Sequence, residues 1–304
     1  MGFSSGTKVL PDIIDDIADG LINSSANWTE GDSSWDTSDR SMANNARRCL
    51  KYTGDTHDIF IALEIINQTN GLNHYSSRRS KGLRVTFSAG WDYSSNNYPA
   101  GSHEMQTFIQ TLASDTTSPH PQSDMATVQF AYWLWIDTQG FSLMAEPEPT
   151  SENRQGSFIC IVERMTSKEY NDGLTNFYCW NRTNNHNQDV YNGARTKHIL
   201  RPFAYQSGHV NQGIMWWRDT DTSRHALKSI GNGKVYFVRP VVCNSTNNMT
   251  PIYQSQHMWM FTQESGLVDG DVVAVDGATT KYLCKSISSP NSNTRLNFAI
   301  KYVE

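Results

Sequence analysis

The chain has 304 residues, which is enough for two ordinary domains or for one large β domain with additions. Hydrophobic residues make up 38% and charged residues 18%, below the typical values of roughly 45–50% and about 25%, whereas aromatic residues reach 11%. This composition excludes a disordered chain and indicates a core under a neutral polar surface. The net charge of −5, without runs of Lys or Arg, argues against nucleic acid as the main partner.

The five cysteines indicate free thiols in a reducing compartment. Their number is odd, no two are closely spaced and no CxxC pair occurs, so neither a disulfide framework nor a zinc site is indicated. Cys160 and Cys284 lie in apolar strand patterns and are expected to be buried. The N-terminus lacks a charged stretch followed by an apolar one, and no window of about 18 apolar residues exists. We therefore expect synthesis in a cytoplasm and no membrane partner.

The clearest helix signal lies near the N-terminus. Pro11 suits a first helical turn. Negative charge, which the helix dipole favours at this end, comes from Asp12, Asp15 and Asp16. Apolar residues with helical spacing are Ile13, Ile14, Ile17 and Leu21. A short helix must bury such a stripe on its own β core or on a neighbouring subunit, so these four residues are interface candidates.

A polar loop with Trp28 and Trp35 follows the helix, and both tryptophans are further interface candidates. The segment 40–50 predicts a second helix, with Asp39 as its N-cap. Residues 1–50 are therefore predicted to form an N-terminal helical and loop segment that acts as a docking arm.

Strand signals dominate residues 51–265. Segments dense in β-branched and aromatic residues are 59–66, 83–88, 125–136, 157–165, 177–180, 214–217, 234–242 and 258–261. The segment 158–162 shows no polar alternation, which predicts a strand covered on both faces. Long polar connectors separate the strands, and connectors of this length are typical of loops that bind something or reach a neighbour.

The last residues, 266–304, are predicted to form a separate small unit. Asp-Gly at 276–277 lies between two apolar runs, which is a strong hairpin signal, and a third strand is expected at 295–303. The predicted fold is therefore mainly β. It consists of a large antiparallel β-sandwich-like domain over 51–265, a short N-terminal helical segment and a small C-terminal β meander.

Several motifs resemble catalytic or metal sites but are better explained as turns or strand ends. The sequence at 231–234 is Gly-Asn-Gly-Lys without phosphate-loop spacing, and that at 269–271 is Asp-Gly-Asp without the terminal Glu of a calcium loop. Glu146 and Glu148, each followed by Pro, are the nearest approach to a catalytic carboxylate pair. Other strand-end carboxylates are Asp137 and Glu163. The scattered histidines show no ligand spacing, so we predict no catalytic, cofactor-binding or metal-binding residue.

Tryptophans with Asn and Asp nearby could form a sugar-stacking platform. The candidates are Trp133, Trp135, Trp180, Trp216, Trp217 and Trp259. For Trp133 and Trp135, a place in the core between sheets is the better interpretation. Trp216 and Trp217 are adjacent, and adjacent strand residues face opposite ways. One of these two should therefore point out of the core, unless a neighbouring layer covers both, and we include both as interface candidates.

A further set of stretches extends over most of the chain. It comprises Asn27-Trp28-Thr29, Trp35, Asn44-Asn45-Ala46-Arg47-Arg48, 59–64, Lys81-Gly82-Leu83, Trp91-Asp92, Trp133-Leu134-Trp135-Ile136-Asp137, Phe141-Ser142-Leu143-Met144, 158–164, Gly270-Asp271-Val272 and Ala299-Ile300-Lys301-Tyr302. Together these stretches resemble structural proteins of tailed bacteriophages, of the neck, collar, tail-adaptor or baseplate kind. The resemblance implies a subunit of a symmetric ring or sleeve, with itself and other virion proteins as partners. It carries over no catalytic residue.

The sequence-based expectation is thus a non-enzymatic structural subunit of a virion that is assembled in a host cytoplasm. Rings of identical subunits need two different complementary surfaces, for which 1–35 and 266–304 are the candidates. One alternative is a receptor-binding protein of the same virion with a glycan as partner. A second alternative is a polysaccharide-degrading enzyme that uses Glu146, Glu148 or Asp137. No cofactor is expected.

Overall fold

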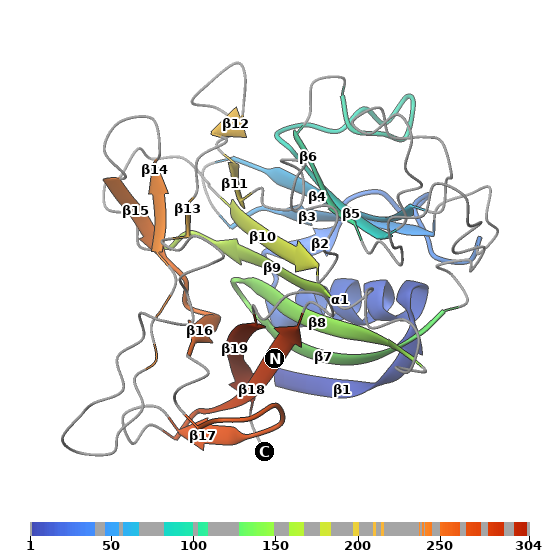
Figure 1. The fold of residues 1–304 in the computed structure, drawn as a ribbon. Coiled ribbons are helices and arrows are strands. Elements are labelled where there is room, and N and C mark those ends of the chain that lie inside the picture. The colour runs from blue at the N-terminus through green and yellow to red at the C-terminus, as the bar shows by residue number, and fades with distance from the viewer. Residues whose placement is uncertain are drawn as a thin grey trace, which may run out of the picture.

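The computed structural model of the chain is mainly β, with four antiparallel sheets and one helix in the part that it describes. The described residues are 2–39, 46–54, 57–66, 82–99, 103–108, 128–148, 158–166, 177–183, 197–200, 209–210, 214–215, 237, 239, 241–244, 250–261, 266–274, 279–288 and 295–302. The predicted fold class is confirmed (Figure 1).

The largest sheet, called the central sheet, has seven strands in the order β1-β7-β8-β9-β10-β11-β12. Their bounds are β1 (Gly2–Val9), β7 (Gln129–Asp137), β8 (Gly140–Glu148), β9 (Phe158–Arg164), β10 (Phe177–Thr183), β11 (Lys197–Leu200) and β12 (His209–Val210). The strands β7 to β10 follow one another as a meander, whereas β1 comes from the start of the chain and pairs with β7.

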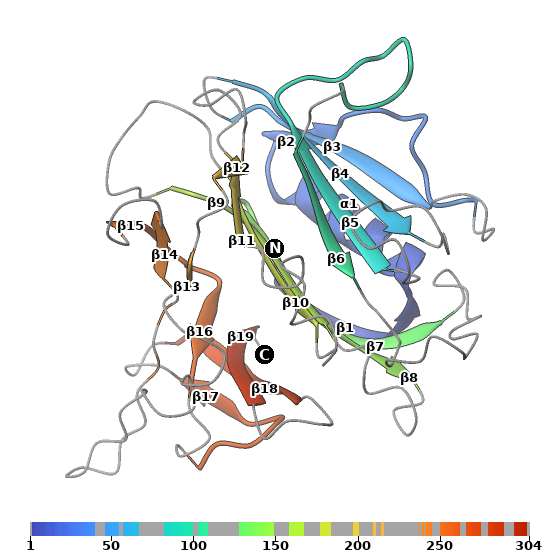
Figure 2. The same ribbon diagram turned by 45° about the horizontal axis from the view of Figure 1, so that its top comes forward.

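A second sheet, the outer sheet, faces the central sheet. Its order is β2-β3-β4-β5-β6, and its strands are β2 (Trp28–Glu30), β3 (Arg47–Tyr52), β4 (Ile59–Ile66), β5 (Gly82–Ser88) and β6 (His103–Phe108). The two sheets come into contact at β6 and β10, and α1 (Leu10–Ser24) lies between them against β7, β2 and β3 (Figure 2). The helix therefore fills the space between the sheets of the predicted sandwich.

The other face of the central sheet is covered by a C-terminal sheet of order β16-β19-β18-β17. Its strands are β16 (Met258–Met260), β17 (Val272–Ala274), β18 (Lys281–Ser288) and β19 (Arg295–Tyr302). A small sheet precedes it, composed of β13 (Ile214–Met215), β14 (Val241–Asn244) and β15 (Thr250–Gln254). The predicted C-terminal meander is confirmed by the antiparallel pairs β17–β18 and β18–β19, whereas its predicted turn at 276–277 lies outside the described residues.

Two hydrophobic clusters lie on opposite faces of the central sheet. Successive strand residues point to opposite faces, so Phe158, Cys160 and Val162 of β9 enter the cluster shared with α1 and the outer sheet. Ile159 and Ile161 enter the cluster shared with the C-terminal sheet. All five residues are buried, which confirms the prediction that this strand is covered on both faces.

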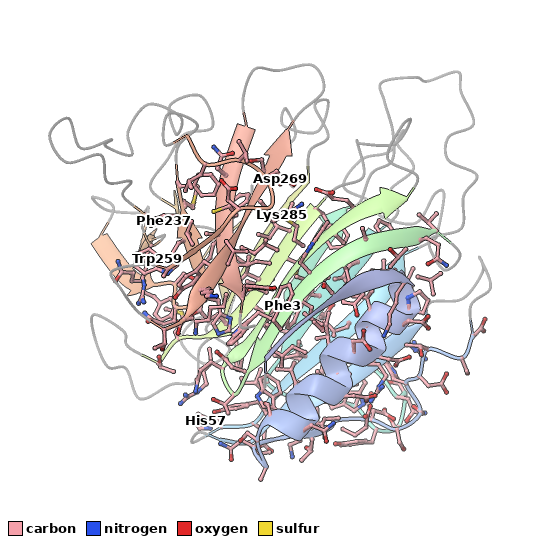
Figure 3. All side chains as sticks on the ribbon, turned by 90° about the horizontal axis from the view of Figure 1, so that it is seen from below. Phe3, His57, Phe237, Trp259, Asp269 and Lys285 are labelled. Carbon is pink, nitrogen blue, oxygen red and sulfur yellow. The ribbon has the colours of Figure 1, made fainter. Side chains whose placement is uncertain are left out.

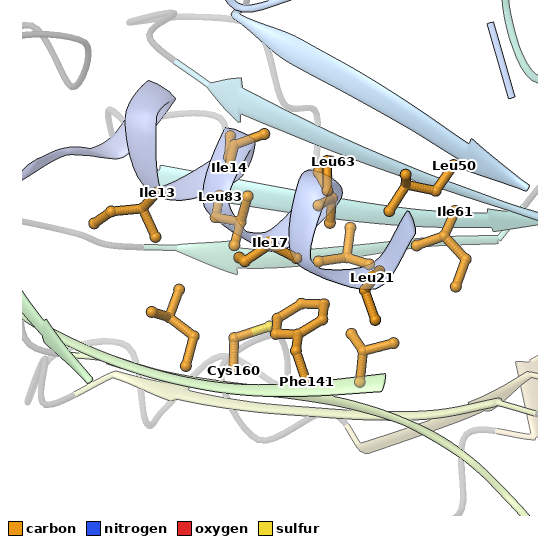
Figure 4. Packing of buried hydrophobic residues seen from close by; sticks show 14 of the residues in the cluster. Ile13, Ile14, Ile17, Leu21, Leu50, Ile61, Leu63, Leu83, Phe141 and Cys160 are labelled. Carbon is orange, nitrogen blue, oxygen red and sulfur yellow. The ribbon is translucent and has the colours of Figure 1, made fainter. Parts of the chain in front are cut away.

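The helix α1 begins close to the predicted start and is anchored at its first turns. Pro11 lies in the first turn, and Lys8 pairs with Asp16 at 2.7 Å. Helical spacing places Ile13, Ile14, Ile17 and Leu21 toward the two sheets, where each is at most 1% exposed. Figure 4 shows these side chains between residues of the outer sheet and Phe141 of the central sheet.

The structure differs from the sequence-based expectations for the N-terminal segment in two respects. Residues 47–50 belong to β3 and not to a second helix, because they pair with β4 from Arg47 to Tyr52. The strand β1 precedes the helix and was missed, because its polar sequence shows no apolar alternation and its strand form comes from pairing with β7. The described residues of the predicted docking arm over 1–50 are built into the fold, since β1, α1, β2 and β3 all belong to the two sheets or lie between them, so any docking by this segment uses surfaces of the folded core.

The C-terminal sheet extends across the predicted boundary at 265/266. The strand β16 pairs with β19 from Met258 to Met260, so the C-terminal sheet takes a strand from before the boundary.

Among the described residues, no helix has the length and apolar character needed to cross a bilayer.

The packing of α1 gives a direct test of where its apolar stripe docks. Ile17→Ala should lower the free energy of unfolding by about 2–5 kcal/mol, because Ile17 is completely buried in the chain's own core. Ile22→Ala is the matched control and should cost clearly less, because Ile22 is only partly buried. Urea unfolding of both variants measures the difference. Equal losses would contradict the packing described here.

Candidate functional site

The candidate site is a polar junction between the central sheet and the C-terminal sheet. On β7 the residues that point toward the C-terminal sheet are Trp133, Trp135 and Asp137, which alternate with buried apolar residues facing α1. On β9 the same alternation brings Glu163 to this face, next to Ile161. We call the group Asp137, Glu163, Tyr253, Ser255, Gln256, His257 and Lys301 the junction.

Strand register brings the two junction carboxylates into one row. Asp137 pairs with Gly140, and Gly140 pairs with Glu163 on the far side, so the carboxylates lie two strands apart. Gly140 has φ +146, and a Cβ atom there would collide with the carbonyl oxygen of Val162. The tight β7–β8 hairpin that aligns the two acids therefore needs glycine at this position.

Glu163 is completely buried and is held by donors from β15 and from the link that follows it. Tyr253 donates its hydroxyl to Oε1 at 2.6 Å, and Ser255 donates its hydroxyl to Oε2 at 2.8 Å. The backbone N–H of Gln256 also donates to Oε1, at 2.5 Å. Three donors replace the water that this carboxylate loses on burial, which is the condition for burying such a group.

His257 lies beside these residues and is completely buried. Its Nε2 is 3.0 Å from Asp137 Oδ1. The same carboxylate accepts from the indole N–H of Trp135 at 3.2 Å and from the backbone N–H of Gln139 at 2.8 Å. Lys301 Nζ lies 3.7 Å from Asp137 Oδ2. Asp137 is thus the acceptor that connects β7 with the C-terminal sheet.

Charge determines the protonation of the Asp137–His257 pair. Burial by itself would raise the pKa of Asp137, but the hydrogen bond and charge of His257 outweigh it and hold that pKa well below its usual value. Burial would likewise lower the pKa of His257. The negative charges of Glu163 and Asp137 outweigh this effect and raise that pKa above 6.5, against an opposing contribution from Lys301. Each member of the pair thus favours the charged form of the other.

A second charged contact between the same two sheets is centred on Lys285 of β18. Its Nζ is 2.7 Å from Asp269 Oδ2 and 3.8 Å from Glu146 Oε1, and it lies 3.9 Å from the centre of the Trp133 ring. Figure 3 shows Lys285 and Asp269 next to each other. Lys301 is placed similarly over Trp135, at 5.4 Å from the ring centre. The two lysines thus cover the indole rings by cation–π contacts.

The junction contains an acid–base pair, but its geometry does not present that pair to a substrate. His257 is completely buried, and the nearby Ser255 hydroxyl is already donated to Glu163. The pKa of the Cys284 thiol is raised to about 12 by burial, and burial also raises the pKa of Cys49 and Cys179, so these thiols are poor nucleophiles. No group of His, Cys, Asp or Glu in the described part of the chain could hold a metal ion. The arrangement is suited to joining layers.

The predicted interface residues of the N-terminal segment lie in the chain's own core, so the prediction is wrong for them. Ile13, Ile14, Ile17, Leu21 and Trp28 belong to the cluster between the two sheets, and the Trp28 indole N–H donates to the carbonyl of Thr138 at 3.0 Å. Trp35 is 1% exposed and donates to the carbonyl of Asn96 at 2.7 Å. Each of these side chains is buried by other residues of the same chain. Trp216 and Trp217 lie outside the described residues.

Most of the other motifs singled out in the sequence lie within the described residues. Residues 269–271 form a turn, as predicted, with Gly270 at φ +93 and Asp271 accepting from the N–H of Val268. Glu146 and Glu148 belong to β8, and Glu146 faces Lys285. Asp137 and Glu163 are brought together, but as structural acceptors. The segment 231–234 lies outside the described residues. Cys160 and Cys284 are buried, as predicted.

Sequence reasoning missed His257, Ser255, Tyr253 and Lys301. These residues come from β15, the β15–β16 link and β19, and only the tertiary fold brings them to β7 and β9. No spacing in the sequence marks them as a set. The one available signal was the pair of carboxylates at the ends of two strongly apolar strands, which needed buried partners.

Comparison of the chain with protein-family models, with curated proteins and with solved structures gives no significant match.

The burial of Glu163 leads to a stability test. Glu163→Gln should lower the free energy of unfolding by about 1–3 kcal/mol, because an amide NH₂ would replace an oxygen that now accepts hydrogen bonds from buried donors. Glu146→Gln should cost less than about 1 kcal/mol, because the Glu146 side chain is 24% exposed and its ion pair with Lys285 spans 3.8 Å. Chemical denaturation compares the two variants. A loss at Glu146 as large as that at Glu163 would refute the assignment of Glu163 as a key acceptor.

The hairpin at Gly140 gives a second test. Gly140→Ala should destabilise the chain by at least about 1–3 kcal/mol, because the new methyl group meets a backbone carbonyl and φ is positive. In Gly6→Ala, the control on β1, the methyl group would only touch the Tyr132 ring at 3.5 Å, so little change is expected. Thermal unfolding distinguishes the two outcomes, and equal shifts would show that the hairpin is not constrained as described.

Proposed function

We propose that the chain is a structural subunit of a tailed-phage virion, of a neck, collar, tail or baseplate ring, and that it acts through protein–protein surfaces. The main support for the proposal is that the charged residues of the junction have a structural role. Asp137, Glu163 and His257 are all engaged in joining one layer of the protein to another. The resemblance of many stretches along the chain to tailed-phage structural proteins supports the particular class.

Exposed apolar side chains supply a candidate contact surface. In the described part of the chain, the large hydrophobic residues with high exposure are Tyr93, Val268 and Val272. Val268 and Val272 are 62% and 41% exposed. Val272 is the first residue of β17, the edge strand of the C-terminal sheet, and Val268 lies just before this strand. An edge strand with exposed valines is a surface suited to another protein chain.

The strand β1 offers a second edge of different character. It ends the order of the central sheet, and its middle residues 4–7 are polar and exposed. It has neither a proline nor a bulge, and its one charged side chain, Lys8, is paired with Asp16. Natural proteins usually protect edges of this length, so an unprotected one favours pairing with a neighbour. Two unlike surfaces on one chain are what a heterologous ring contact requires.

The two alternative functions receive less support from the described residues. For glycan binding, the rings of Trp133 and Trp135 are covered by Lys285 and Lys301, and Trp259 lies 4.5 Å from the Arg239 guanidinium. For polysaccharide degradation, Asp137 is already bonded to His257. A stacking platform or a free acid–base pair would need these groups uncovered.

The proposal is tested by the assembly state of the chain. Native mass spectrometry and negative-stain microscopy at increasing concentration should show closed rings, and Val268→Lys with Val272→Lys should reduce them at least tenfold, because the introduced charges would be buried in the contact. Thr29→Lys, at an exposed position on β2 of the outer sheet, is the matched control and should leave assembly unchanged. A chain that stays monomeric at every concentration, alone and with other virion proteins, would contradict the proposed function.

A further inference from the structure

We propose that the junction is a proton-controlled latch, in which a charged His257 holds the C-terminal sheet on the central sheet and loss of one proton loosens it. This inference concerns the folded chain itself and does not rest on the proposed function.

The latch is built on one short link of the chain. Residues 255–257 connect β15 to β16, and each of them reaches the central sheet. The Ser255 hydroxyl and the Gln256 N–H bind Glu163 on β9, and the His257 ring binds Asp137 on β7. Three consecutive residues thus connect the C-terminal sheet to two strands of the central sheet. Loosening one of these contacts strains the others, because they share the same backbone.

Three strands contribute the charges that the structure describes around His257. Asp137 of β7 and Glu163 of β9 are negative, and Lys301 of β19 is positive. Tyr253 of β15 contributes a neutral hydroxyl bound to Glu163. With His257 protonated, two negative and two positive charges balance. With His257 neutral, Asp137, Glu163 and Lys301 together carry a net charge of −1. This net charge is unfavourable because Glu163 is buried at low dielectric.

The two ring nitrogens of His257 have different roles. Nε2 donates to Asp137, whereas Nδ1 is buried and has no hydrogen-bond partner among the described atoms. The proton on Nδ1 is therefore the one that leaves: the N–H bond breaks, its electron pair stays on nitrogen and the proton passes to water. Asp137 keeps 17% of its side chain exposed, so the pair has an edge at the solvent. The remaining Nε2 hydrogen bond then lacks the assistance of a positive charge and is weaker.

The pKa shifts of His257 and Asp137 determine how the strength of the junction changes with pH. The pKa of His257 is raised in the folded chain, so its contribution is complete below about pH 6.5 and is lost as the pH rises through the folded value. The pKa of Asp137 is lowered, so its contribution is complete above about pH 3.8 and is lost as the pH falls through the folded value. The junction is thus strongest between these limits, and the latch loosens on the alkaline side.

Hydrogen exchange of the intact chain, followed by mass spectrometry and corrected for the intrinsic effect of pH, tests the proposal. Above pH 6.5 the opening constant of β16 and β19 should rise by up to about tenfold per pH unit until the folded pKa is reached, whereas that of β2, an edge strand of the outer sheet that can open with the junction intact, should stay constant. In His257→Gln the rise should disappear, because Gln can bind Asp137 but has no proton to lose. His57→Gln, at a half-buried histidine before β4, is the control and should behave as the wild type.

A second measurement uses the wild-type chain and covers the case in which His257→Gln does not fold. The imidazole resonance of His257, assigned by elimination with variants of the other eight histidines, should titrate with a midpoint above pH 6.5. A midpoint at or below 6.5 would overturn the latch. The same pH dependence of exchange in His257→Gln and in the wild type would also overturn it.

Discussion

The burial of β9 on both of its faces is the constraint on which the rest of the structure depends. From Phe158 to Glu163 every side chain is buried, and neighbours along the strand point to opposite sides of the central sheet. Such a strand cannot lie at a surface, so it requires one apolar layer on each face. The outer sheet with α1 provides one layer, and the C-terminal sheet provides the other. The C-terminal sheet is therefore a part of the core and not an appended unit.

The same constraint explains the junction. The alternation that buries Ile159 and Ile161 also places Glu163 between two sheets, where an unpartnered carboxylate would be costly. Donors from residues 253–256 satisfy it, and His257 and Asp137 extend the contact to β7. Replacing a buried ion pair by apolar residues often leaves stability unchanged, so we propose that the junction serves mainly to align the two layers. The resulting layered unit leaves its edges, at β17 and β1, as the surfaces through which we propose that it meets other proteins.

Sequence patterns predicted the elements whose formation is local and missed those that depend on the fold. The helical spacing of residues 13–21 and the apolar runs at 59–66 and 282–287 carry their own signals, and the matching elements α1, β4 and β18 are present. The partner of the α1 stripe was left open, because periodicity identifies an apolar face but not what covers it. The strand β1 is polar and forms by pairing with β7, 120 or more positions away. His257 was missed for the same reason, since nothing local connects it with Asp137.

Native-state hydrogen exchange of the β9 amides at pH 6 tests the double coverage of this strand most directly. If both faces are buried as described, the amides of β9 exchange only through global unfolding, with the free energy and the denaturant dependence of the whole chain. The amides of β17, at the edge of the C-terminal sheet, should exchange through smaller openings. Exchange of β9 at the low free energy of a local opening, with little dependence on denaturant, would contradict its place at the centre of the structure.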